Sequence, residues 1–445
     1  MSLAQVAADR DFVDARRRDM RQLMERLYPV CRSLTGPGVR ETLQVLAERM
    51  PLRQVETPSG TQVFDWTVPD EWTPRGARIT DASGRVVADL LDHTLHLVGY
   101  SVPFAGRLTR DELAAHVHTL PEHPTWIPYR TSYYTPQWGF CLTQLQWEAA
   151  GDGPFDVVVD TSLAPGGLVY GELVIPGSSE QEVLVSAHVC HPSLANDNLS
   201  GIVVATELAR ALSSAPRRLT YRFVFAPGTI GSLVWLSGNR DRWSKIRHGL
   251  VLTGLGGGGP LVYKRTRRGD RPVDAAVEHV VRRRGGAVRD YSPWGYDERQ
   301  YNALGFDLPV GRLTRTPHGE YPEYHTSADD LDFVGDDELA EAFDAVVEVV
   351  DVLEGEATYS NASPFGEPQL GKRGLYPSTG GESAGDEVLA MLWCLACSDS
   401  TTGLLAIAER AELPFAAIRS AADRLLAAGL LREAAGAGGD GGTHA

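Results

Sequence analysis

Between residues 168 and 350, short apolar runs alternate with amphipathic segments, and this alternation constrains the fold more than any other feature of the chain. Four runs have strand length, and the segment after the second one has helical spacing: GELVIPG, EVLVSAH, TYRFVFA and GLVLTG, with LSGIVVATELARALSSA as the helix. Strands that alternate with helices build a largely parallel sheet covered by helices. The sequence therefore predicts an α/β domain.

The segments on either side of this pattern have different textures. Residues 1–50 show helical spacing interrupted by a TGPG turn, so we expect two helices there. From about 60 to 165, short aromatic and β-branched runs are broken by Pro and Gly, which predicts a β-rich module. A Gly-, Pro- and Ser-rich linker is expected at about 355–382. Residues 386–433 then have the spacing of three helices around a Pro-marked turn, as in a winged helix.

The net charge and the cysteine content limit which binding partners and which cellular compartment we expect. The chain has 445 residues and a formal net charge of −16, so we expect neither a nucleic acid nor a membrane as its partner. A small-molecule or short-peptide substrate fits this charge better. The N-terminus lacks the apolar core of a signal peptide, and no later window holds about 18 uninterrupted apolar residues. Five scattered cysteines suit a reducing compartment, so we expect a cytoplasmic protein.

Two features of the C-terminal part have more than one interpretation. Cys394 and Cys397 form a CxxC pair inside an apolar run, without a second pair, so we expect buried helix cysteines rather than a metal or redox site. The presumed recognition helix carries Arg419 and Arg424 but also Asp423. This favours contact with a protein partner or a second copy of the chain over DNA binding.

The residues that end the predicted strands are the best candidates for a site, because ligands of open α/β sheets gather at the carboxyl ends of the strands. His188 ends the run EVLVSAH, and Asp197 lies further along at the start of a helix. Imidazole and carboxylate are both good zinc ligands, so the two side chains could share one ion. Ordinary N-capping by the Asn-Asp-Asn run is an equal alternative. His325, in a polar segment far downstream, is either a third ligand or a surface histidine.

Long ordered motifs in this chain resemble those of a known family, the aminopeptidase-like domain proteins related to the di-zinc aminopeptidase and transferrin-receptor superfamily. The α/β motifs are SAHVCHPSLANDNLSG, FVFAPGTIGS, DERQYNALGFDLPVGRL and RTPHGEYPEYHTSADDLDF. The β-rich motifs are DWTVPDEW, HLVGYSVPF and IPYRTSYYTPQWGFC. Residues 386–433 resemble the family's C-terminal winged helix, so the resemblance covers nearly the whole chain.

This resemblance implies an α/β fold class: a phosphorylase/hydrolase-like three-layer zinc-exopeptidase domain with an inserted β-rich domain and a C-terminal winged helix. The expected boundaries are 1–60 and 166–360 for the α/β domain, 61–165 for the insert, 383–434 for the winged helix and 435–445 for a disordered tail. The resemblance also implies that zinc is the cofactor and that His188, Asp197 and His325 are its ligands.

The chain departs from the family's site at several positions. Cys190 stands where classical members have an aspartate that orients the first histidine, and His191 is either a further ligand or a structural residue. Gly228 and Thr229 stand where the superfamily has two glutamates, a general base and a zinc ligand. The loop 253–259 has no carboxylate for the expected aspartate ligand, and its glycine run lacks the lysine of a phosphate-binding loop. We therefore expect one zinc rather than two.

Other side chains are available for the missing roles. We assign catalysis to Glu298 and Glu323, with Asp297 and Glu320 as alternatives, and substrate positioning to Arg299 and Tyr324. The expected function is zinc-dependent, aminopeptidase-like hydrolysis of a small peptide, amide or modified amino-acyl substrate at a degenerate single-metal site. The first alternative is a catalytically inactive binding or scaffold protein, and the second is a DNA-binding regulator with a ligand-sensing domain.

Overall fold

The computed structural model describes residues 10–375 and 385–434. Contacts divide the chain into two compact units. The first contains the chain up to Asp274 together with Val281–Val347, and the second contains Ala275–Val280 and the chain from Glu348 onward. The tail expected at 435–445 lies outside the described residues, as does part of the expected linker.

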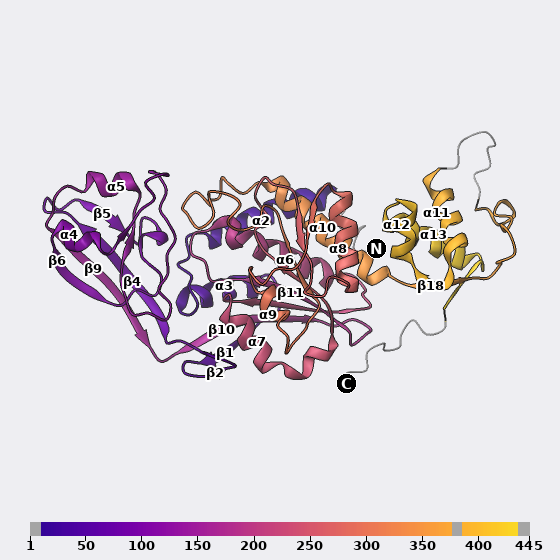
Figure 1. Cartoon of the computed structure of the whole chain (residues 1–445), viewed down its shortest axis with the longest axis horizontal. Coiled ribbons are helices and arrows are strands. Elements are labelled where there is room, and N and C mark those ends of the chain that lie inside the picture. Colours follow the sequence, from indigo (N-terminus) through magenta and orange to yellow (C-terminus); the bar gives the residue numbers. More distant parts are fainter. Residues whose placement is uncertain (1–9, 376–384, 435–445) are drawn as a thin grey trace. The chain divides into compact units, whose positions relative to one another are not determined.

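An eight-stranded sheet forms the centre of the first unit (Figure 1). In spatial order its strands are β1 (Arg53–Pro58), β10 (Gly167–Ile175), β12 (Thr220–Ala226), β11 (Glu182–His188), β13 (Ile246–Leu252), β16 (Val310–Thr314), β14 (Val262–Lys264) and β15 (Ala287–Arg289). The four middle strands, β12 to β16, are parallel, whereas β1, β10 and β14 make antiparallel pairs. The predicted α/β architecture is confirmed, with a mixed sheet.

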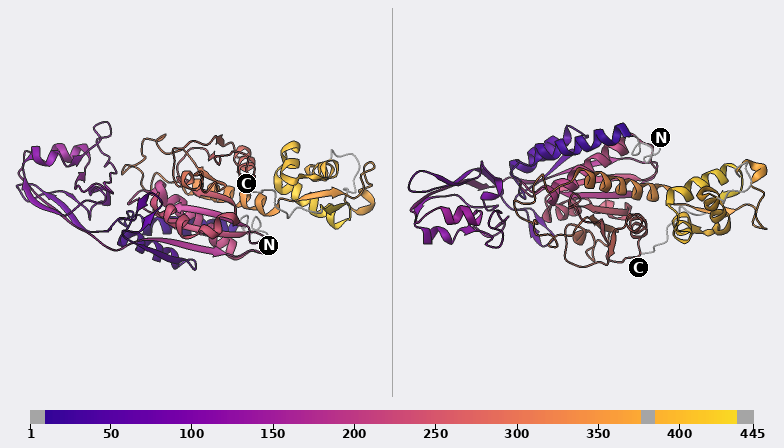
Figure 2. Two further views of the ribbon diagram at one scale, coloured as in Figure 1. Left: turned by 60° about the horizontal axis from the view of Figure 1, so that its bottom comes forward. Right: turned by 90° about the horizontal axis from the view of Figure 1, so that it is seen from above.

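Helices cover both faces of this sheet. β11 and β12 are buried along their whole length, as expected for strands covered on two sides. α6 (Gly201–Ser213) packs on β11 and β13 together with α2 (Arg10–Leu27), and α7 (Ile230–Gly238) packs with α9 (Glu298–Tyr301). The chain moves in opposite directions along the sheet from β11 to β12 and from β12 to β13. Right-handed crossovers therefore place α6 and α7 on opposite faces. Figure 2 shows helices on both sides of the sheet.

Three further helices are α3 (Pro37–Ala47), α8 (Pro272–Arg283) and α10 (Asp336–Gly355). α2 and α3 are the two helices that the sequence predicts in the first 50 residues. Among the described residues, no helix combines the length and the apolar character needed to cross a membrane.

The β-rich module predicted after residue 60 is also present. Its antiparallel sheet has the order β5 (Val86–Asp89), β4 (Glu71–Thr80), β9 (Phe155–Ala164) and β6 (Phe104–Leu108). Buried and exposed residues alternate along β9, because one face of this sheet packs on a core that contains Trp72 and Tyr100. Shorter elements are β2 (Gln62–Val63), β3 (Trp66–Thr67), α4 (Arg110–Ala114), β7 (Val117–His118), β8 (Phe140–Cys141) and α5 (Gln144–Ala149). Contacts join this module to the α/β part in one unit, so its boundaries at 61 and 165 stay a prediction.

The second unit has the helices and the small sheet of a winged helix. They are α11 (Asp386–Cys397), α12 (Leu404–Ala411) and α13 (Phe415–Ala427), with a sheet in the order β18 (Asp399–Gly403), β17 (Thr358–Asn361) and β19 (Leu431–Glu433). β17 lies in the segment expected to be linker, because its four residues form a strand only by pairing with β18 and β19. Cys394 and Cys397 are buried free thiols on α11, as expected.

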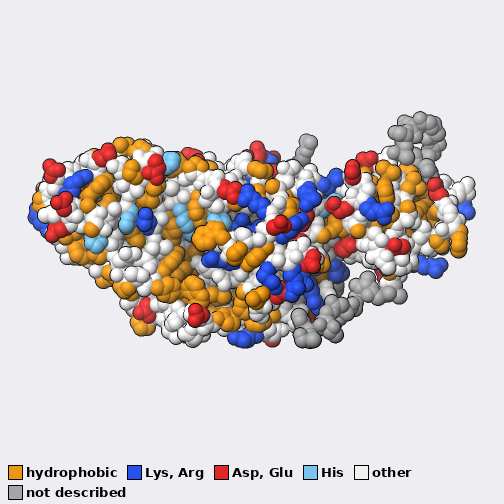
Figure 3. Space-filling model, in the orientation of Figure 1, with side chains coloured by type: hydrophobic (Ala, Val, Ile, Leu, Met, Phe, Trp, Pro, Cys, Tyr) orange, Lys and Arg blue, Asp and Glu red, His pale blue; other side chains and the backbone are white. Residues whose placement is uncertain are grey.

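Both arginines of α13 are engaged inside this unit. Arg419 donates to the Gly355 carbonyl (2.7 Å) and pairs with Asp423, and Arg424 pairs with Glu387 (3.0 Å). The exposed side chains of α13 are small or acidic: Ala416, Ser420, Asp423 and Ala427. Figure 3 shows acidic and basic side chains mixed over the visible face of the unit. α13 itself, all of which is described, presents no free cation to a phosphate backbone.

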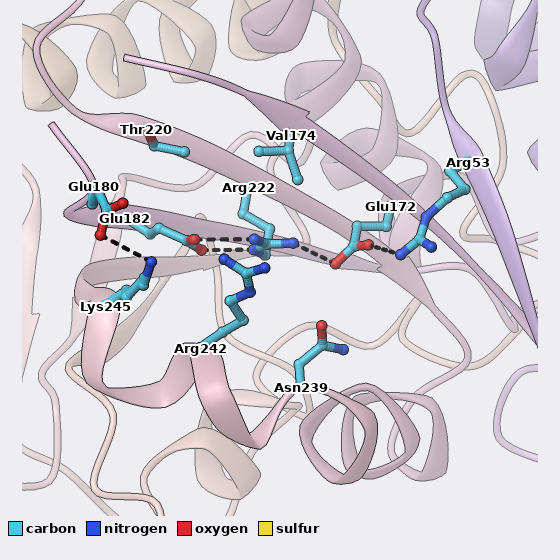
Figure 4. A pocket seen from close by; sticks show the side chains of 10 residues that line it. All are labelled: Arg53, Glu172, Val174, Glu180, Glu182, Thr220, Arg222, Asn239, Arg242 and Lys245. Atoms are coloured by element: carbon cyan, nitrogen blue, oxygen red, sulfur yellow. Dashed lines mark hydrogen bonds and ion pairs between the residues drawn. The ribbon is translucent and has the colours of Figure 1, made fainter. Parts of the chain in front are cut away.

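A charged hollow of about 410 Å³ lies at the amino-terminal ends of β11 and β12, the ends opposite to His188 (Figure 4). Arg222 lies at its centre and donates to Glu182 (2.7 and 3.0 Å) and to Glu172 (2.7 Å). All three side chains are buried, and the Trp235 indole also donates to Glu172 (2.9 Å). Arg53 pairs with Glu172 as well (2.5 Å), so two arginines balance the two glutamates and the hollow is best described as a structural ion-pair network.

Candidate metal site

The turn between β11 and α6 brings the first two predicted ligands together. His188 closes β11, and Asp197 lies in a single π-helical turn, Ala195–Ser200, with non-helical backbone angles. The His188 Nε2 lies 2.9 Å from the Asp197 Oδ1, and both side chains are almost completely buried. Asp197 does not cap α6: the Asn198 Oδ1 accepts the Gly201 amide instead (3.2 Å). The capping alternative therefore belongs to Asn198, and the Asp197 carboxylate faces histidine.

His325 meets the other oxygen of the same carboxylate, with its Nε2 3.0 Å from the Asp197 Oδ2. Its backbone has φ = 58°, a left-handed conformation that is uncommon for a residue other than glycine. Hydrogen bonds to the β-rich module hold it there: the Tyr129 amide donates to the His325 carbonyl (2.8 Å), and the Ser327 amide donates to the Ile127 carbonyl (2.8 Å). His325 is thus a fixed residue of the site and not a mobile surface histidine.

Two more side chains support the turn that carries Asp197. The Asp329 carboxylate accepts the amides of Asn196 (2.5 Å) and Asp197 (3.0 Å), and burial raises the pKa of Asp329 to about 8. Asn198 accepts the Gly254 amide (3.3 Å) and donates to the carbonyls of the strands on either side of the site. Sequence reasoning missed both supports. In the sequence, only the position of Asp329 four residues after His325 indicated that it could belong to the site.

The electrostatics keep Asp197 ionised. Burial alone would raise the pKa of Asp197, but His191, His188 and His325 around the carboxylate lower it well below its usual value. Burial lowers the pKa of His191 to about 3, although the Asp197 carboxylate opposes the shift. A buried carboxylate surrounded by imidazoles is an arrangement that suits a zinc ion.

Gly228 is the position where a base is missing, and Asp297 fills the neighbouring space. A Cβ atom at Gly228 would lie 3.3 Å from the Asp297 Oδ1 and 3.3 Å from the His188 Cβ. Asp297 is 2 % exposed, and burial raises its pKa to about 6, although His188, Arg299 and a hydrogen bond with Ser232 oppose the shift. The Asp297 carboxylate, which comes from a segment distant in sequence, therefore lies beside His188.

The two glutamates assigned to catalysis have other surroundings. Glu298 is fully buried and pairs with Lys264 (2.9 Å) and Arg312 (3.5 Å). Glu323 is partly exposed, and its backbone carbonyl accepts the Thr326 amide (3.0 Å). Within the described residues, neither carboxylate has a hydrogen bond or ion pair with the three predicted ligands. The alternative Glu320 pairs with Arg289 on the surface.

Aromatic rings surround the histidines. The Tyr324 ring stacks on His325 with centroids 3.9 Å apart, and the Tyr296 ring stacks on His188 at 5.0 Å. Tyr129 from the β-rich module makes edge contacts with His191 (5.3 Å) and His325 (5.0 Å). Of these rings, only Tyr324 was predicted to belong to the site. Tyr129 could not be found from spacing, because it reaches the site across the module boundary.

Arg299 lies at the edge of the same region. It donates to the Thr229 hydroxyl (3.4 Å), and its guanidinium lies 5.9 Å from the ring centroid of Trp294, which is 72 % exposed. A second hollow, of about 490 Å³, is lined by Phe64, Trp66, Leu233, Arg240, Trp243, Gln300 and Phe306, among others. Neither this hollow nor the charged one is lined by His188, Asp197 or His325.

The first half of the glycine-rich loop 253–259 supports the Asp197 turn. Its amides are already used: Gly254 donates to Asn198 (3.3 Å), Leu255 to the Ser200 hydroxyl (2.9 Å), and Gly256 to the Asn196 side chain (2.8 Å). A Cβ atom at Gly256 would lie 2.4 Å from a Val334 methyl group, so glycine is required for close packing.

Comparison with known proteins identifies the fold and the family of the chain. The fold is that of the aminopeptidases, followed by a winged helix: a winged helix-turn-helix family model matches residues 357–433, and BSAP, a zinc aminopeptidase from Bacillus subtilis, has a similar structure (TM-score 0.55, 15% identity, 77% of this chain and 95% of that chain). The model of DUF4910, a domain of unknown function, matches residues 21–356. This chain belongs to the DUF4910 family.

Two matches from Clostridium acetobutylicum cover nearly the whole chain. One is a protein whose name provisionally assigns it to polysaccharide biosynthesis and gives it an aminopeptidase-like domain; it is 45% identical over 414 residues, 92% of this chain and 95% of the relative. The other is the crystal structure of a provisionally assigned peptidase, with a TM-score of 0.91 and 42% identity over 97% of this chain and 100% of that chain. The recognised resemblance, aminopeptidase-like with a C-terminal winged helix, is confirmed.

Proposed function

We propose that this chain is a zinc-dependent hydrolase of the aminopeptidase-like class that cleaves an amide in a small molecule or short peptide. The observation that supports it best is the buried Asp197 carboxylate, which holds His188 on one oxygen (2.9 Å) and His325 on the other (3.0 Å). A structural core rarely buries an ionised carboxylate among histidines without a metal or a catalytic role.

The residues present fit zinc. Two imidazoles and one carboxylate are the donor set of several catalytic zinc sites, which keep one position open. His188, Asp197 and His325 would hold the ion, which would supply Lewis-acid polarisation of a carbonyl group and would make water more acidic. The buried His188 Nδ1 has no partner among the described residues, so the ring lacks the usual orienting hydrogen bond.

In this proposal Asp297 is the proton acceptor that compensates for Gly228. With a pKa of about 6, its carboxylate is ionised at neutral pH and basic enough to take a proton from the attacking water. The same carboxyl group then returns the proton to the leaving amine, which completes hydrolysis. Glu298, neutralised by Lys264 and Arg312, would instead help to fix Arg299 and the start of α9.

Substrate would be oriented by the side chains around the histidines. Arg299 and Tyr324 are the positioning groups proposed from sequence, and the exposed ring of Trp294 adds an apolar surface beside Arg299. Because a 45% identical relative is provisionally assigned to polysaccharide biosynthesis, amides of modified sugars belong among the substrates to be screened beside aminoacyl amides.

A second candidate function is a catalytically inactive binding or scaffold protein. The missing carboxylates at Gly228, Thr229 and the loop 253–259 favour it, as does the unoriented His188 ring. In either case we place the protein in the cytoplasm, because all five cysteines are free thiols. We also propose that the winged helix contacts a protein partner or a second copy of the chain.

Zinc content and turnover test the proposal together. Protein purified without chelator should hold about one zinc per chain, and His188→Ala should lose it. The parent protein should hydrolyse an amide in the screen, and Asp297→Asn should lower kcat by about 10² to 10⁴ while zinc stays bound. Less than about half an equivalent of zinc in the parent would refute the metalloenzyme. Bound zinc without turnover of any amide would favour the scaffold.

A further inference from the structure

His191 lies in the turn that follows β11 and is fixed by its backbone. The Arg32 Nε donates to the His191 carbonyl (2.7 Å), and Arg32 is itself 2 % exposed and bonded to the Leu27 carbonyl. The residue therefore has little freedom to move away from the site. Its imidazole is 12 % exposed and lies among the rings of His188, His325 and Tyr129.

The distance between His191 and Asp197 has a specific meaning. The His191 Nε2 lies 3.9 Å from the Asp197 Oδ2, which is too far for a hydrogen bond. Two ligand atoms that each bind one zinc at about 2.0–2.1 Å are separated by roughly 3.3–4 Å. The gap is thus already the width of a shared ion. His188 and His325, at 2.9 and 3.0 Å from the carboxylate oxygens, would have to move away by a few tenths of an ångström to admit the same ion.

The grouping of donor atoms supports this. The ligand atoms of His188, His191 and Asp197 all lie within 4.8 Å of one another, the one such group of three or more His, Cys, Asp or Glu side chains that the described residues contain. His325 reaches the Asp197 Oδ2 but lies outside this group. The Cys190 thiol lies 3.8 Å from the His191 Nδ1, a weak contact that leaves the Nε2 of the ring available.

We propose that His191 is a further zinc ligand, which supplies a donor that Thr229 cannot. With four protein ligands, water or a substrate carbonyl would have to bind as a fifth ligand. The proposal rests on the zinc site proposed above. Its consequence for chemistry is electrostatic: a neutral imidazole replaces a carboxylate, so the single carboxylate of Asp197 leaves the positive charge of the ion only partly neutralised. Such a site polarises a substrate carbonyl more strongly than one with several carboxylate ligands.

Zinc affinity measured with a chromophoric chelator tests the assignment. His191→Ala is expected to weaken zinc binding by more than about 100-fold, beyond the effect of losing an outer hydrogen bond. His191→Phe keeps an aromatic ring against Tyr129 and should lose zinc equally. The matched control is His116→Ala, because His116 also stacks on an aromatic ring, Trp138 (3.8 Å), but lies in the β-rich module away from Asp197. Visible absorption of the cobalt-substituted protein should change in both His191 variants and stay constant in the control.

The outcomes separate this proposal from the function on which it rests. If His191→Phe binds zinc as tightly as the parent while His188→Ala does not, His191 is a packing residue and the proposal is wrong, although the zinc site stands. If the parent binds no zinc, both proposals fail. Loss of zinc in both His191 variants, with far-ultraviolet circular dichroism unchanged, supports the assignment whether or not any substrate is hydrolysed.

Discussion

Asp297→Asn should make the folded protein more stable at neutral pH while it removes the proposed base. Burial raises the pKa of Asp297 from its ordinary value of 3.8 to about 6. The folded state therefore binds the proton more tightly than the unfolded chain, so stability falls as the pH rises through the window between these values. Above about pH 6 the folded state bears the full free-energy cost of burying the ionised Asp297 carboxylate. At about 1.4 kcal/mol per pH unit, the shift corresponds to about 3 kcal/mol.

The variant cannot ionise, so its advantage over the parent should grow with pH. We expect it to be about 1 kcal/mol more stable at about pH 4.5 and about 3 kcal/mol at about pH 7.5. Urea unfolding followed by tryptophan fluorescence, on protein freed of metal with chelator, measures this difference. Metal must be absent, because a cation near His188 would itself lower the pKa of the carboxyl group.

The matched control is Asp156→Asn, because Asp156 is exposed and 3.9 Å from Arg107. Its stability difference from the parent should not depend on pH. A constant difference between Asp297→Asn and the parent across the same range would mean that the carboxylate is solvated in solution. That result would remove the physical basis for assigning Asp297 as a base.

Three further predictions concern other parts of the chain. Arg222→Met removes the cation paired with the buried Glu182 and one of the two paired with Glu172, which keeps Arg53, and should cost about 3–5 kcal/mol of unfolding free energy in urea; a cost below about 1 kcal/mol would show that water reaches the network. Asn198→Ala removes the side-chain hydrogen bonds that join the Asp197 turn to β13 and the glycine-rich loop. It should weaken zinc binding by about 10- to 100-fold in chelator competition, and an unchanged affinity would contradict this supporting role. Trp294→Ala, at an exposed ring, should raise KM several-fold without lowering kcat or stability; an effect on kcat alone would argue against substrate contact.

The layered fold could be predicted because its signals are local. The buried strands β11 and β12 are mostly apolar, and the turn residues that end them are visible in the sequence. The convergence of His188 and Asp197 was predictable for the same reason, since both lie at one strand end. What spacing alone could not decide was which residue of the Asn-Asp-Asn run caps α6. The choice of Asn198 depends on the positions of the Leu252 carbonyl of β13 and the Gly254 amide, to which its side chain bonds. These positions are set by the tertiary structure.

The parts that escaped prediction are contacts between distant segments. Asp297 was one of four candidate bases in the sequence, and only its position beside Gly228 distinguishes it from Glu298, which faces Lys264 and Arg312. β17 lies in the predicted linker, because four residues among Gly, Pro and Ser are too short a run to indicate a strand without the pairing with β18 and β19. The roles assigned to Glu298 and Glu323 remain predictions, as does the boundary of the β-rich module.

The hydrogen bonds between the Ile127–Tyr129 segment and the His325 loop also set an order of events during folding. Ile127 binds Ser327 across 200 residues, and His325 reaches Asp197 across 128 residues. A chain that emerges from the ribosome N-terminus first therefore holds His188 and Asp197 long before the last histidine can arrive. Contacts of such sequence separation form late. Tight metal uptake would then mark the end of folding, and a nascent chain could not carry a mature site.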